Sequence, residues 1–456
     1  MKKKLILFIV LTIITFLYTW FILEIMCDEI WIYGFGYNIY SRLIPYKDFN
    51  MVVGPLYPYI VSFFIKIFGH HLYSIEILNA IIISMITIIS YSKIGKNAFL
   101  LFFPLLCYSY PHYNNFCLLL TLLIVYINES NKIKYKDLFI GLLIGCIFIT
   151  KQSIGICFSI VMIICMKNKL KKIIGFIIPC IIMCIYLIYN SAFFEYIDYC
   201  YLGMLDFGEK NTNLFYLIPY LVLISYLVYQ IYKSRFKDET ALFILAYSSV
   251  CIPIFDTTHF ILFIIAFLYY IIDKYKDKAI KNYKYLFVIS LSFLVFTLIS
   301  EPKHNYQIYR DKSSFLYGKA VYGGKSNYQE FNITMKEYIN KIKSNYENIY
   351  FFLDDKAYLI KLDINYPITK YDLINNGNLG YNGEKKYIRS LDNICKKESC
   401  IFFIGNNKNT LISQTNKNII DYAKIRNNKI DKIEILSKNK KKLNNSINIL
   451  VYDNKK

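Results

Sequence analysis

Long apolar runs alternate with short basic clusters through the first 300 residues, a pattern that predicts a bundle of membrane-spanning helices. The first run, Leu5–Met26, has about 22 residues, which is enough to cross the hydrocarbon core of a bilayer. It follows Lys2, Lys3 and Lys4, and no small-residue cleavage site comes after it. We therefore predict an uncleaved first span whose N-terminus lies in the cytoplasm.

Basic clusters orient the remaining spans, because cytoplasmic loops carry an excess of Lys and Arg. If every cluster faces the cytoplasm, an even number of crossings separates neighbouring clusters, and four stretches become helical hairpins. With single spans at 5–26, 72–91 and 285–300, the total is about eleven spans, and residues 301–456 lie outside the cytoplasm. The hairpins are 97–130, 137–166, 173–232 and 239–273.

The same parity argument places the segment 27–71. It contains an apolar stretch, Met51–Phe68, that has the length of a span. If this stretch crossed the membrane, every later basic cluster would face outward, against the charge rule. We therefore predict that 27–71 is a long first outer loop with interfacial helices on the membrane surface.

Composition and charge sharpen this picture. The chain has 456 residues, of which 56% are hydrophobic and only 19% are charged, and a mean hydropathy of +0.35, which excludes an ordinary soluble enzyme. Its net charge is nevertheless +21. In residues 1–300, 20 of the 25 Lys and Arg belong to the orienting clusters. Because orientation explains most of that basic charge, we predict no nucleic-acid partner.

Residues 301–456 alternate helical and strand patterns, which predicts a small extracytoplasmic α/β domain. No catalytic constellation is visible there, so acceptor binding and capping of the membrane domain both stay open. Cys395 and Cys400 are near enough in sequence to form a disulfide, and the sequence leaves that question open. The expected helices are 328–344, 356–362, 384–394 and 416–424, and the expected strands are 348–353, 400–405, 432–436 and 447–452.

The predicted topology places nine carboxylates but only five basic residues on the outer face. We therefore expect any chemistry at the outer membrane interface. The strongest single signal is Asp28 with Glu29, directly after the first span. A carboxylate held at such an interface is a candidate general base. Without its sequence context, the pair is better explained as the solvated end of a helix than as a catalytic site.

The residues that follow the acidic pair change this interpretation. An aromatic amphipathic helix, the tract Ile44–Phe49 (IPYKDF), the tract Gly54–Tyr57 (GPLY) and a helix ending at Phe68 come after it. The segment resembles the first outer loop of GT-C-type glycosyltransferases, in particular the protein O-mannosyltransferase and aminoarabinose transferase superfamily (glycosyltransferase family 39 and its bacterial relatives). Later tracts similar to those of this family are Ile149–Gln152 (ITKQ) and Pro253–His259 (PIFDTTH).

The resemblance implies a GT-C-like membrane domain over residues 1–300 and transfer of a sugar with inversion at its anomeric carbon. The donor would be a polyprenyl-phosphate-linked sugar held among membrane lipids, and the acceptor a cell-envelope glycan, lipid or protein on the outer side. Asp28 matches the family's catalytic aspartate, with the role of general base. Glu29 matches the second acid, which orients the acceptor or Asp28 or helps to bind a divalent metal, the candidate cofactor.

Cations must stabilise the carrier phosphate as it leaves, and Lys151 is the strongest candidate because it lies in a turn between two apolar runs. A lysine that snorkels to the surface is the alternative. Arg42 is a second candidate, and lipid headgroups are its alternative partner. Aminoarabinose transferases carry a basic residue just before the Pro-Leu-Tyr tract, and Met51–Gly54 lacks it. Further candidate substrate contacts are Asp48, Tyr57, Gln152, Asp256 and His259, the last two having a structural hydrogen bond as the alternative.

Two other functions stay open from the sequence. A surface-polysaccharide polymerase or ligase also spans the membrane many times and acts on lipid-linked sugars. It does not explain the acidic pair and the interfacial helices after the first span. A transporter is disfavoured, because transporters place ionisable residues near the bilayer midplane and here these residues collect on one face.

Overall fold

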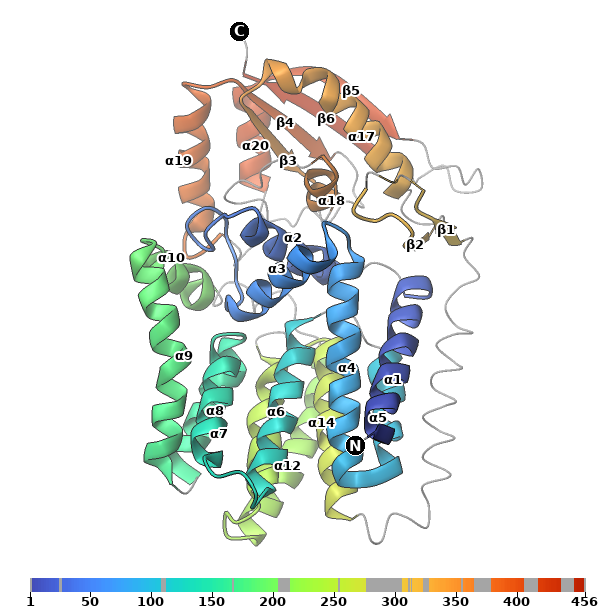
Figure 1. The fold of residues 1–456 in the computed structure, drawn as a ribbon. Coiled ribbons are helices and arrows are strands. Elements are labelled where there is room, and N and C mark those ends of the chain that lie inside the picture. The colour runs from blue at the N-terminus through green and yellow to red at the C-terminus, as the bar shows by residue number, and fades with distance from the viewer. Residues whose placement is uncertain are drawn as a thin grey trace.

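The molecule has three layers along its long axis (Figure 1). A helical bundle forms one end, two short helices cover it, and an α/β domain sits above them. This architecture comes from a computed structural model of the chain. It describes residues 2–23, 27–107, 112–165, 168–203, 214–252, 255–275, 306–310, 312, 314–322, 328–353, 356–364, 379–405, 417–435 and 447–454.

The bundle is built from the apolar runs of the first part of the chain, and helices and turns follow one another as the basic clusters predict. The predicted hairpins 97–130, 137–166, 173–232 and 239–273 each contain two of the bundle helices, although one helix in the first and one in the last has only nine residues. The predicted last span, 285–300, and the boundary at residue 300 lie outside the described residues. The bundle helices are α1 (Lys2–Phe21), α4 (Tyr73–Ile94), α5 (Phe99–Cys107), α6 (Tyr113–Glu129), α7 (Lys136–Phe148), α8 (Gln152–Cys165), α9 (Lys169–Tyr189), α12 (Leu217–Lys233), α13 (Glu239–Tyr247) and α14 (Thr257–Lys274).

Four helical stretches among the described residues are long and apolar enough to cross a membrane. Other apolar helices of the bundle are shorter, so the count of about eleven spans stays a prediction. The outward side of α9 carries a row of exposed isoleucines, including Ile181, Ile182 and Ile185 at 50%, 64% and 63% exposure. Apolar surface of this kind is stable only when lipid or another protein covers it, as expected for a membrane protein. The four stretches are Lys2–Phe21, Tyr73–Cys107, Lys169–Tyr189 and Thr257–Lys274.

Glycines bring α7 and α9 into close contact. A Cβ at Gly141 would lie 1.9 Å from the carbonyl oxygen of Lys172, and one at Gly175 would lie 2.1 Å from that of Leu138. Lys172 itself is buried and pairs with Asp137 at 2.8 Å. This packing holds the first half of α7 against the start of α9.

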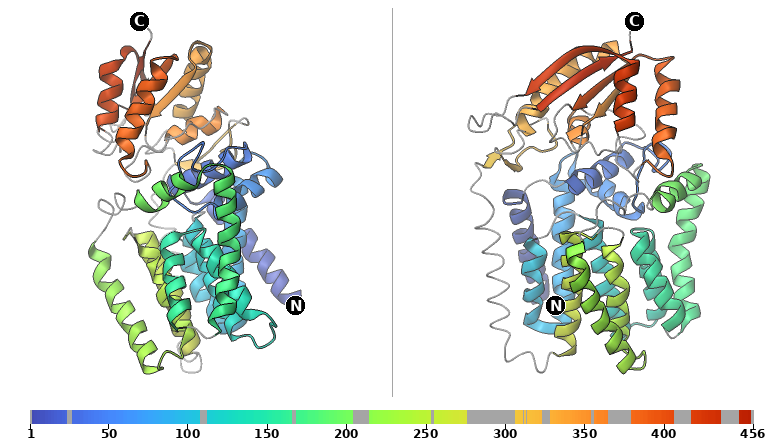
Figure 2. Two further views of the ribbon diagram at one scale, coloured as in Figure 1. Left: turned by 90° about the vertical axis from the view of Figure 1, so that its left-hand side faces the viewer. Right: turned by 180° about the vertical axis from the view of Figure 1, so that it is seen from behind.

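The middle layer consists of α2 (Cys27–Tyr40) and α3 (Leu56–Phe68), which pack against each other between the bundle and the α/β domain (Figures 1 and 2). Gly36 permits the close approach, because a Cβ there would lie 2.4 Å from Val61. The predicted interfacial helix over 51–68 begins only at Leu56. Pro55 precedes the first turn, and proline has no N–H to continue a helix backwards. These are the interfacial helices predicted for 27–71, and their outer location stays a prediction.

The α/β domain has a four-stranded sheet in the order β3-β4-β6-β5. Strands β3 and β4 are parallel, and β6 is antiparallel to both β4 and β5. Two three-residue strands, β1 (Tyr306–Ile308) and β2 (Ala320–Tyr322), form a separate antiparallel pair that the sequence patterns did not indicate. The sheet strands are β3 (Asn348–Phe352), β4 (Cys400–Gly405), β5 (Asn428–Ile435) and β6 (Ile447–Asp453), and the helices are α17 (Tyr328–Ile342), α18 (Lys356–Asp363), α19 (Gly383–Cys395) and α20 (Lys417–Arg426).

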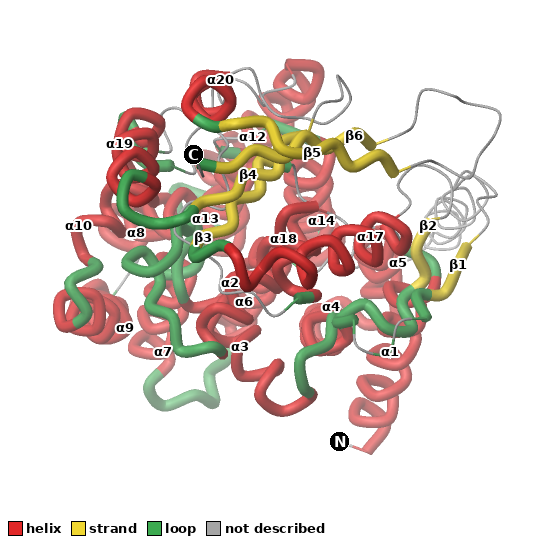
Figure 3. Tube along the Cα trace, turned by 90° about the horizontal axis from the view of Figure 1, so that it is seen from above, coloured by secondary structure: helices red, strands yellow, loops and turns green. Residues whose placement is uncertain are grey.

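Both faces of this sheet are covered, so the domain has two small cores. Along a strand, successive side chains point to opposite faces. In β3, Ile349 and Phe351 pack under α17 and α18, and Tyr350 and Phe352 pack under α19 and α20. Figure 3 shows the sheet between these two pairs of helices.

The elements predicted for this domain are confirmed to within a few residues. Runs buried on both faces are continuous in apolar residues, and β4 (CIFFIG) shows that pattern directly. Cys395 and Cys400 form a disulfide that joins the end of α19 to the start of β4.

Candidate active site

Several turns converge at the end of the bundle that faces the middle layer. Helices α2, α6, α8 and α14 all begin there, and their first residues or N-caps carry the predicted site. Hydrogen bonds between these turns, described below, join residues up to 99 positions apart in sequence.

Asp28 lies in the first turn of α2, and its carboxylate contacts His112. The His112 Nε2 atom is 3.1 Å from Asp28 Oδ2. His112 is the N-cap of α6, and its Nδ1 accepts a hydrogen bond from the backbone N–H of Asn114. A neutral imidazole that accepts at Nδ1 carries its proton at Nε2. His112 therefore donates to Asp28 and fixes the direction of that carboxylate.

The carboxylate remains accessible. The Asp28 side chain is 50% exposed, whereas that of His112 is 5% exposed. Oδ1 of Asp28 accepts no hydrogen bond within the described part of the chain. One carboxylate oxygen is thus oriented by the protein, and the other is open to a ligand.

A second Asp–His pair stands beside the first. Asp256 is the N-cap of α14, where its Oδ1 accepts hydrogen bonds from the backbone N–H of His259 and lies 2.8 Å from His259 Nδ1. The rings of His112 and His259 are edge to face, with centroids 6.0 Å apart. The structure thus brings Asp28, Asp256 and His259 close together and adds His112 to them. Residues 253–254 of the predicted tract lie outside the described residues.

Lys151 is buried next to these pairs. Its Nζ donates to the carbonyl oxygen of Val250 at 2.8 Å and lies 5.7 Å from the centroid of the Tyr113 ring. Only 6% of the residue is exposed, so it does not snorkel to a free surface. Its ammonium also interacts electrostatically with Asp256 and Asp28.

Ionisation of the site follows from these contacts. Desolvation alone would raise the pKa of Asp28, but the hydrogen bond from His112 and the nearby imidazoles outweigh it and hold that pKa below its usual value. The bond with His259 likewise outweighs desolvation at Asp256 and lowers its pKa. Burial lowers the pKa of Lys151 to about 8, against the opposing pull of nearby thiols and carboxylates. Near neutral pH the site therefore holds two carboxylates and one ammonium.

The tract Met51–Gly54, which lacks the basic residue of aminoarabinose transferases, packs against the turn that carries Lys151. The backbone N–H of Gly54 donates to the carbonyl oxygen of Thr150 at 3.0 Å. A Cβ at Gly54 would lie 2.1 Å from the carbonyl oxygen of Ile149. This tract therefore supports Lys151 through backbone contacts.

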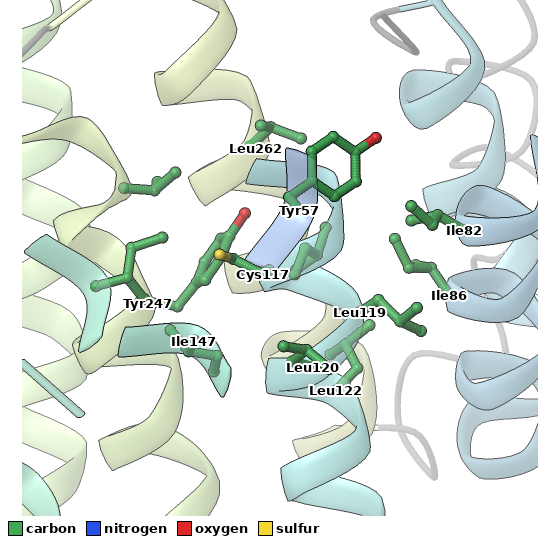
Figure 4. Close-up of a cluster of buried hydrophobic side chains, with 14 of the residues drawn as sticks. Tyr57, Ile82, Ile86, Cys117, Leu119, Leu120, Leu122, Ile147, Tyr247 and Leu262 are labelled. Carbon is green, nitrogen blue, oxygen red and sulfur yellow. The ribbon is translucent and has the colours of Figure 1, made fainter. Parts of the chain in front are cut away.

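Tyr57 and Gln152 belong to the starts of α3 and α8, which follow this tract and this turn in the chain. Tyr57 is fully buried beside Phe116, and its hydroxyl has no hydrogen-bond partner in the described structure. Gln152 is 5% exposed, and its Nε2 is likewise unpartnered among the described residues. Beneath them the bundle is apolar, as Figure 4 shows for side chains of α4, α6, α7, α13 and α14 around Cys117 and Tyr247.

Asp48 and Arg42 belong to the loop between α2 and α3, away from the two Asp–His pairs. Asp48 Oδ2 accepts a hydrogen bond from the backbone N–H of Ile44 at 2.7 Å and so closes the turn. Arg42 has a left-handed backbone (φ 67°) just after α2, and it is exposed. No contact in the described structure joins either side chain to Asp28.

Glu29 points away from its neighbour Asp28. It is 1% exposed, and its Oε1 lies 3.8 Å from the Nζ of Lys319, a buried lysine from the C-terminal part of the chain. Lys319 also donates to Glu76 Oε1 at 2.5 Å. The acidic pair of the sequence is therefore divided between two environments, one open and one buried.

The described residues include no group of three or more His, Cys, Asp or Glu arranged to hold a metal ion. In each Asp–His pair the two side chains bond to each other, and one of them also accepts a hydrogen bond from a backbone N–H group at the start of α6 or α14. The residues present thus do not match the ligand set of a typical protein metal site, and we assign no step to a metal.

Three residues of this region were not singled out from the sequence. His112 belongs to an aromatic run that is equally typical of the aromatic belt at a membrane interface. Its position directly before a helix, two residues ahead of Asn114, is nevertheless a signal for a helix N-cap. Glu76 lay at the start of an apolar run. Lys319 had no local signal, because one lysine among the many of residues 301–456 does not stand out.

Comparison with solved structures identifies the fold. The chain is similar to ArnT from Cupriavidus metallidurans bound to undecaprenyl phosphate, with a TM-score of 0.56, 8% sequence identity, and coverage of 99% of this chain and 98% of that one. For ArnT of the same organism in the apo state the TM-score is 0.56 and the identity 10%, over 100% and 98% of the two chains. Both matches extend over nearly the whole chain, so the chain has the fold of ArnT, in line with the fold expected from the first outer loop. No protein-family profile and no curated protein sequence matches the chain.

Proposed function

We propose that this protein is a membrane glycosyltransferase that moves a sugar from a polyprenyl-phosphate carrier to an acceptor hydroxyl. The observation that carries the proposal is the accessible carboxylate of Asp28, aimed by His112 at the end of a GT-C-like bundle. A carboxylate that stays ionised at neutral pH and has one free oxygen is suited to accept a proton.

The reaction proceeds by one displacement at the anomeric carbon. Asp28 takes the proton of the acceptor hydroxyl while the acceptor oxygen forms its bond to that carbon. The bond from the carbon to the carrier phosphate breaks on the opposite side, and its electron pair stays on the phosphate. The configuration is thereby inverted. Asp28 is left protonated and returns its proton to solvent.

Lys151 supplies positive charge to the leaving phosphate. It is buried, and its electrostatic interactions reach both Asp28 and Asp256. A cation in a dry site stabilises charge that develops in the transition state far more than one in water. The related fold of ArnT, which was crystallised with undecaprenyl phosphate, supports a carrier of the same chemical class. Asp256, His259, Tyr57 and Gln152 are the proposed contacts to sugar or acceptor.

The proposed site faces the outside of the cell membrane. The orienting basic clusters argue for this side, because those of their residues that the structure describes lie at the helix ends away from the α/β domain or in loops there. The acceptor is then a cell-envelope glycan, lipid or protein, and the α/β domain is extracytoplasmic.

Mass spectrometry of lipid-linked sugars and surface glycans tests the function. Cells with the protein and cells without it are compared. We expect the deficient cells to accumulate one polyprenyl-phosphate sugar and to lack one single-sugar substituent of a surface glycan, lipid or protein. Reintroducing the wild-type protein, but not Asp28→Asn, should reverse both changes. Purified protein assayed with that donor, with and without a chelator, then shows whether the predicted divalent metal is needed.

Two results would contradict the proposal. Unchanged lipid-linked sugars and unchanged glycans in the deficient cells exclude sugar transfer from such a carrier. Loss of whole glycan chains, rather than of one substituent, favours instead the polymerase or ligase that also acts on lipid-linked sugars.

A further inference from the structure

We infer that Lys319 is a positioning residue for Asp28, through which the C-terminal part of the chain sets the geometry of the active site. This inference rests on the proposed function. Lys319 does not touch the site described above. It acts on Glu29, the residue next to Asp28 in the first turn of α2.

The contacts of Lys319 join three helices at one point. Its Nζ donates to the carbonyl oxygen of Thr19 in α1 at 2.8 Å and to Glu76 Oε1 in α4 at 2.5 Å. It lies 3.8 Å from Glu29 Oε1 in α2. The Trp20 ring covers it, with 5.5 Å from Nζ to the ring centroid. The side chains of Lys319, Glu29 and Glu76 are each 1% exposed or less, so no solvent screens these charges.

One stripe of α2 faces this contact. Residues four apart lie on one side of a helix, so Glu29, Tyr33 and Tyr37 share a face. Tyr33 stacks on Phe315 with ring centroids 5.2 Å apart, and its hydroxyl bonds to His70 Nδ1 at 2.8 Å. The segment 314–319, which we call the docking segment, thus meets this stripe at Glu29 and at Tyr33. Asp28, one residue from Glu29, lies on a different side and reaches His112.

The docking segment is itself tied to the α/β domain and to the start of α4. Ser314 Oγ donates to Asp363 Oδ1 at the end of α18 at 2.6 Å. The backbone N–H of Leu72 donates to the carbonyl oxygen of Phe315 at 2.8 Å. The docking segment therefore connects the α/β domain, through hydrogen bonds and packing, to the helix that carries Asp28.

Charge makes Lys319 the decisive part of this connection. Burial would lower the pKa of Lys319, but the carboxylates of Glu29 and Glu76 outweigh burial and raise it, so the ammonium persists. With both carboxylates ionised, the group carries a net charge of −1. Without Lys319 it would carry −2. Like charges in a low-dielectric region repel strongly, so Glu29 would move and take the first turn of α2 with it.

The test compares Lys319→Met with the double variant Glu29→Gln/Lys319→Met in full-length protein reconstituted with lipid. The pH profile of kcat/KM for sugar transfer is measured. In Lys319→Met, extra negative charge next to Asp28 favours the protonated form of Asp28, so the acid limb should move to higher pH and kcat should fall about tenfold or more. The double variant restores a net charge of −1, and its acid limb should return toward that of the wild type.

Lys386→Met is the matched control. Lys386 also joins the α/β domain to the rest of the chain, through Asp198 at 2.8 Å, but it is exposed and its ion pair does not involve Glu29. In Lys386→Met, the acid limb of the kcat/KM profile should stay at the pH of the wild type. Equal profiles for Lys386→Met and Lys319→Met, or a Lys319→Met profile equal to that of the wild type, would overturn the inference.

Hydrogen–deuterium exchange gives a readout that does not depend on activity. In Lys319→Met, the amide of Leu72 and those in the first two turns of α2 should exchange faster than in the wild type. Unchanged exchange at these amides also overturns the inference. If the wild-type protein transfers no sugar, the proposed function fails, while exchange still decides whether Lys319 positions α2.

Discussion

His112 Nε2 lies 3.1 Å from Asp28 Oδ2, although 84 residues separate the two in sequence. The backbone N–H of Asn114 fixes the imidazole from its other side. The general base of the proposed reaction is therefore aimed by a histidine that also begins a bundle helix. The same relationship links the ionisation of Asp28 to the integrity of α6.

Replacing Asp28 with Asn removes the proposed base but keeps the shape of the side chain. We expect sugar transfer to fall by at least about 100-fold, the usual contribution of a positioned general base. Expression and thermal stability should stay near those of the wild type. The matched control is Glu337→Gln at an exposed position of α17, which should keep full activity. Activity retained by Asp28→Asn would remove Asp28 from the mechanism.

His112→Asn separates the two contacts of His112. Asparagine is a good N-cap, so it can replace the bond to Asn114, but it is too short to reach Asp28. Without that bond, desolvation dominates and the pKa of Asp28 rises. The ionised base is then lost at a higher pH. We expect the acid limb of the kcat/KM profile to move upward and kcat to fall about 10- to 100-fold. An acid limb in its original place argues that His112 serves α6 alone.

Lys151→Met tests the cation at the leaving phosphate. Loss of one group that stabilises developing charge typically reduces kcat by about 100- to 1,000-fold. The pKa of Lys151, lowered to about 8 by burial, adds a pH signature. As the pH rises through 8, Lys151 loses its proton and its charge, so activity should decline. In Lys151→Arg the guanidinium stays charged, and the decline near pH 8 should disappear even if the overall rate is lower. A decline that persists in Lys151→Arg points to another group.

Gly54→Ala tests the support behind Lys151. The added Cβ would meet the carbonyl of Ile149, and the backbone must shift, at a cost of about 1–3 kcal/mol. The turn that carries Lys151 would move with it. We expect a lower melting temperature and reduced sugar transfer.

Gly95→Ala is the comparison for that variant. Gly95 has no atom near the new Cβ, but its backbone (φ 60°, ψ −141°) lies in a region that alanine rarely adopts, which costs about 1–3 kcal/mol. It lies at the opposite end of α4 from Glu76. We expect Gly95→Ala to lose about as much stability as Gly54→Ala and to keep full activity. Equal activity losses in the two variants would show that Gly54→Ala acts through general stability and not through the site.

Much of the fold could be predicted because its signals are local. Apolar runs and basic clusters predict the bundle helices, and a continuous apolar sequence predicts buried strands such as β4. The start of α3 after Gly54-Pro55 is also a local signal, although the predicted helix was drawn too long. Asp28, Asp256, His259 and Lys151 could be named as candidates because each stands next to a predicted span, and their roles stay predictions.

The separation of Asp28 from Glu29 could not be read in this way. Adjacent residues on a helix point about 100° apart, and only the neighbours decide which side is open. Here α6 offers a histidine to one side, and the docking segment offers Lys319 to the other.

The sequence by itself thus determined which stretches become helices and strands, which residues stand at the ends of spans, and that Asp28 is a candidate base. Only the tertiary structure decided that His112 aims Asp28 and that Lys319 joins Glu29 and Glu76, the latter across 243 residues. The physical reason is the distance along the chain over which each kind of interaction acts. Hydrophobic periodicity and helix capping act over a few neighbouring residues, whereas contacts between distant residues depend on how the finished helices pack.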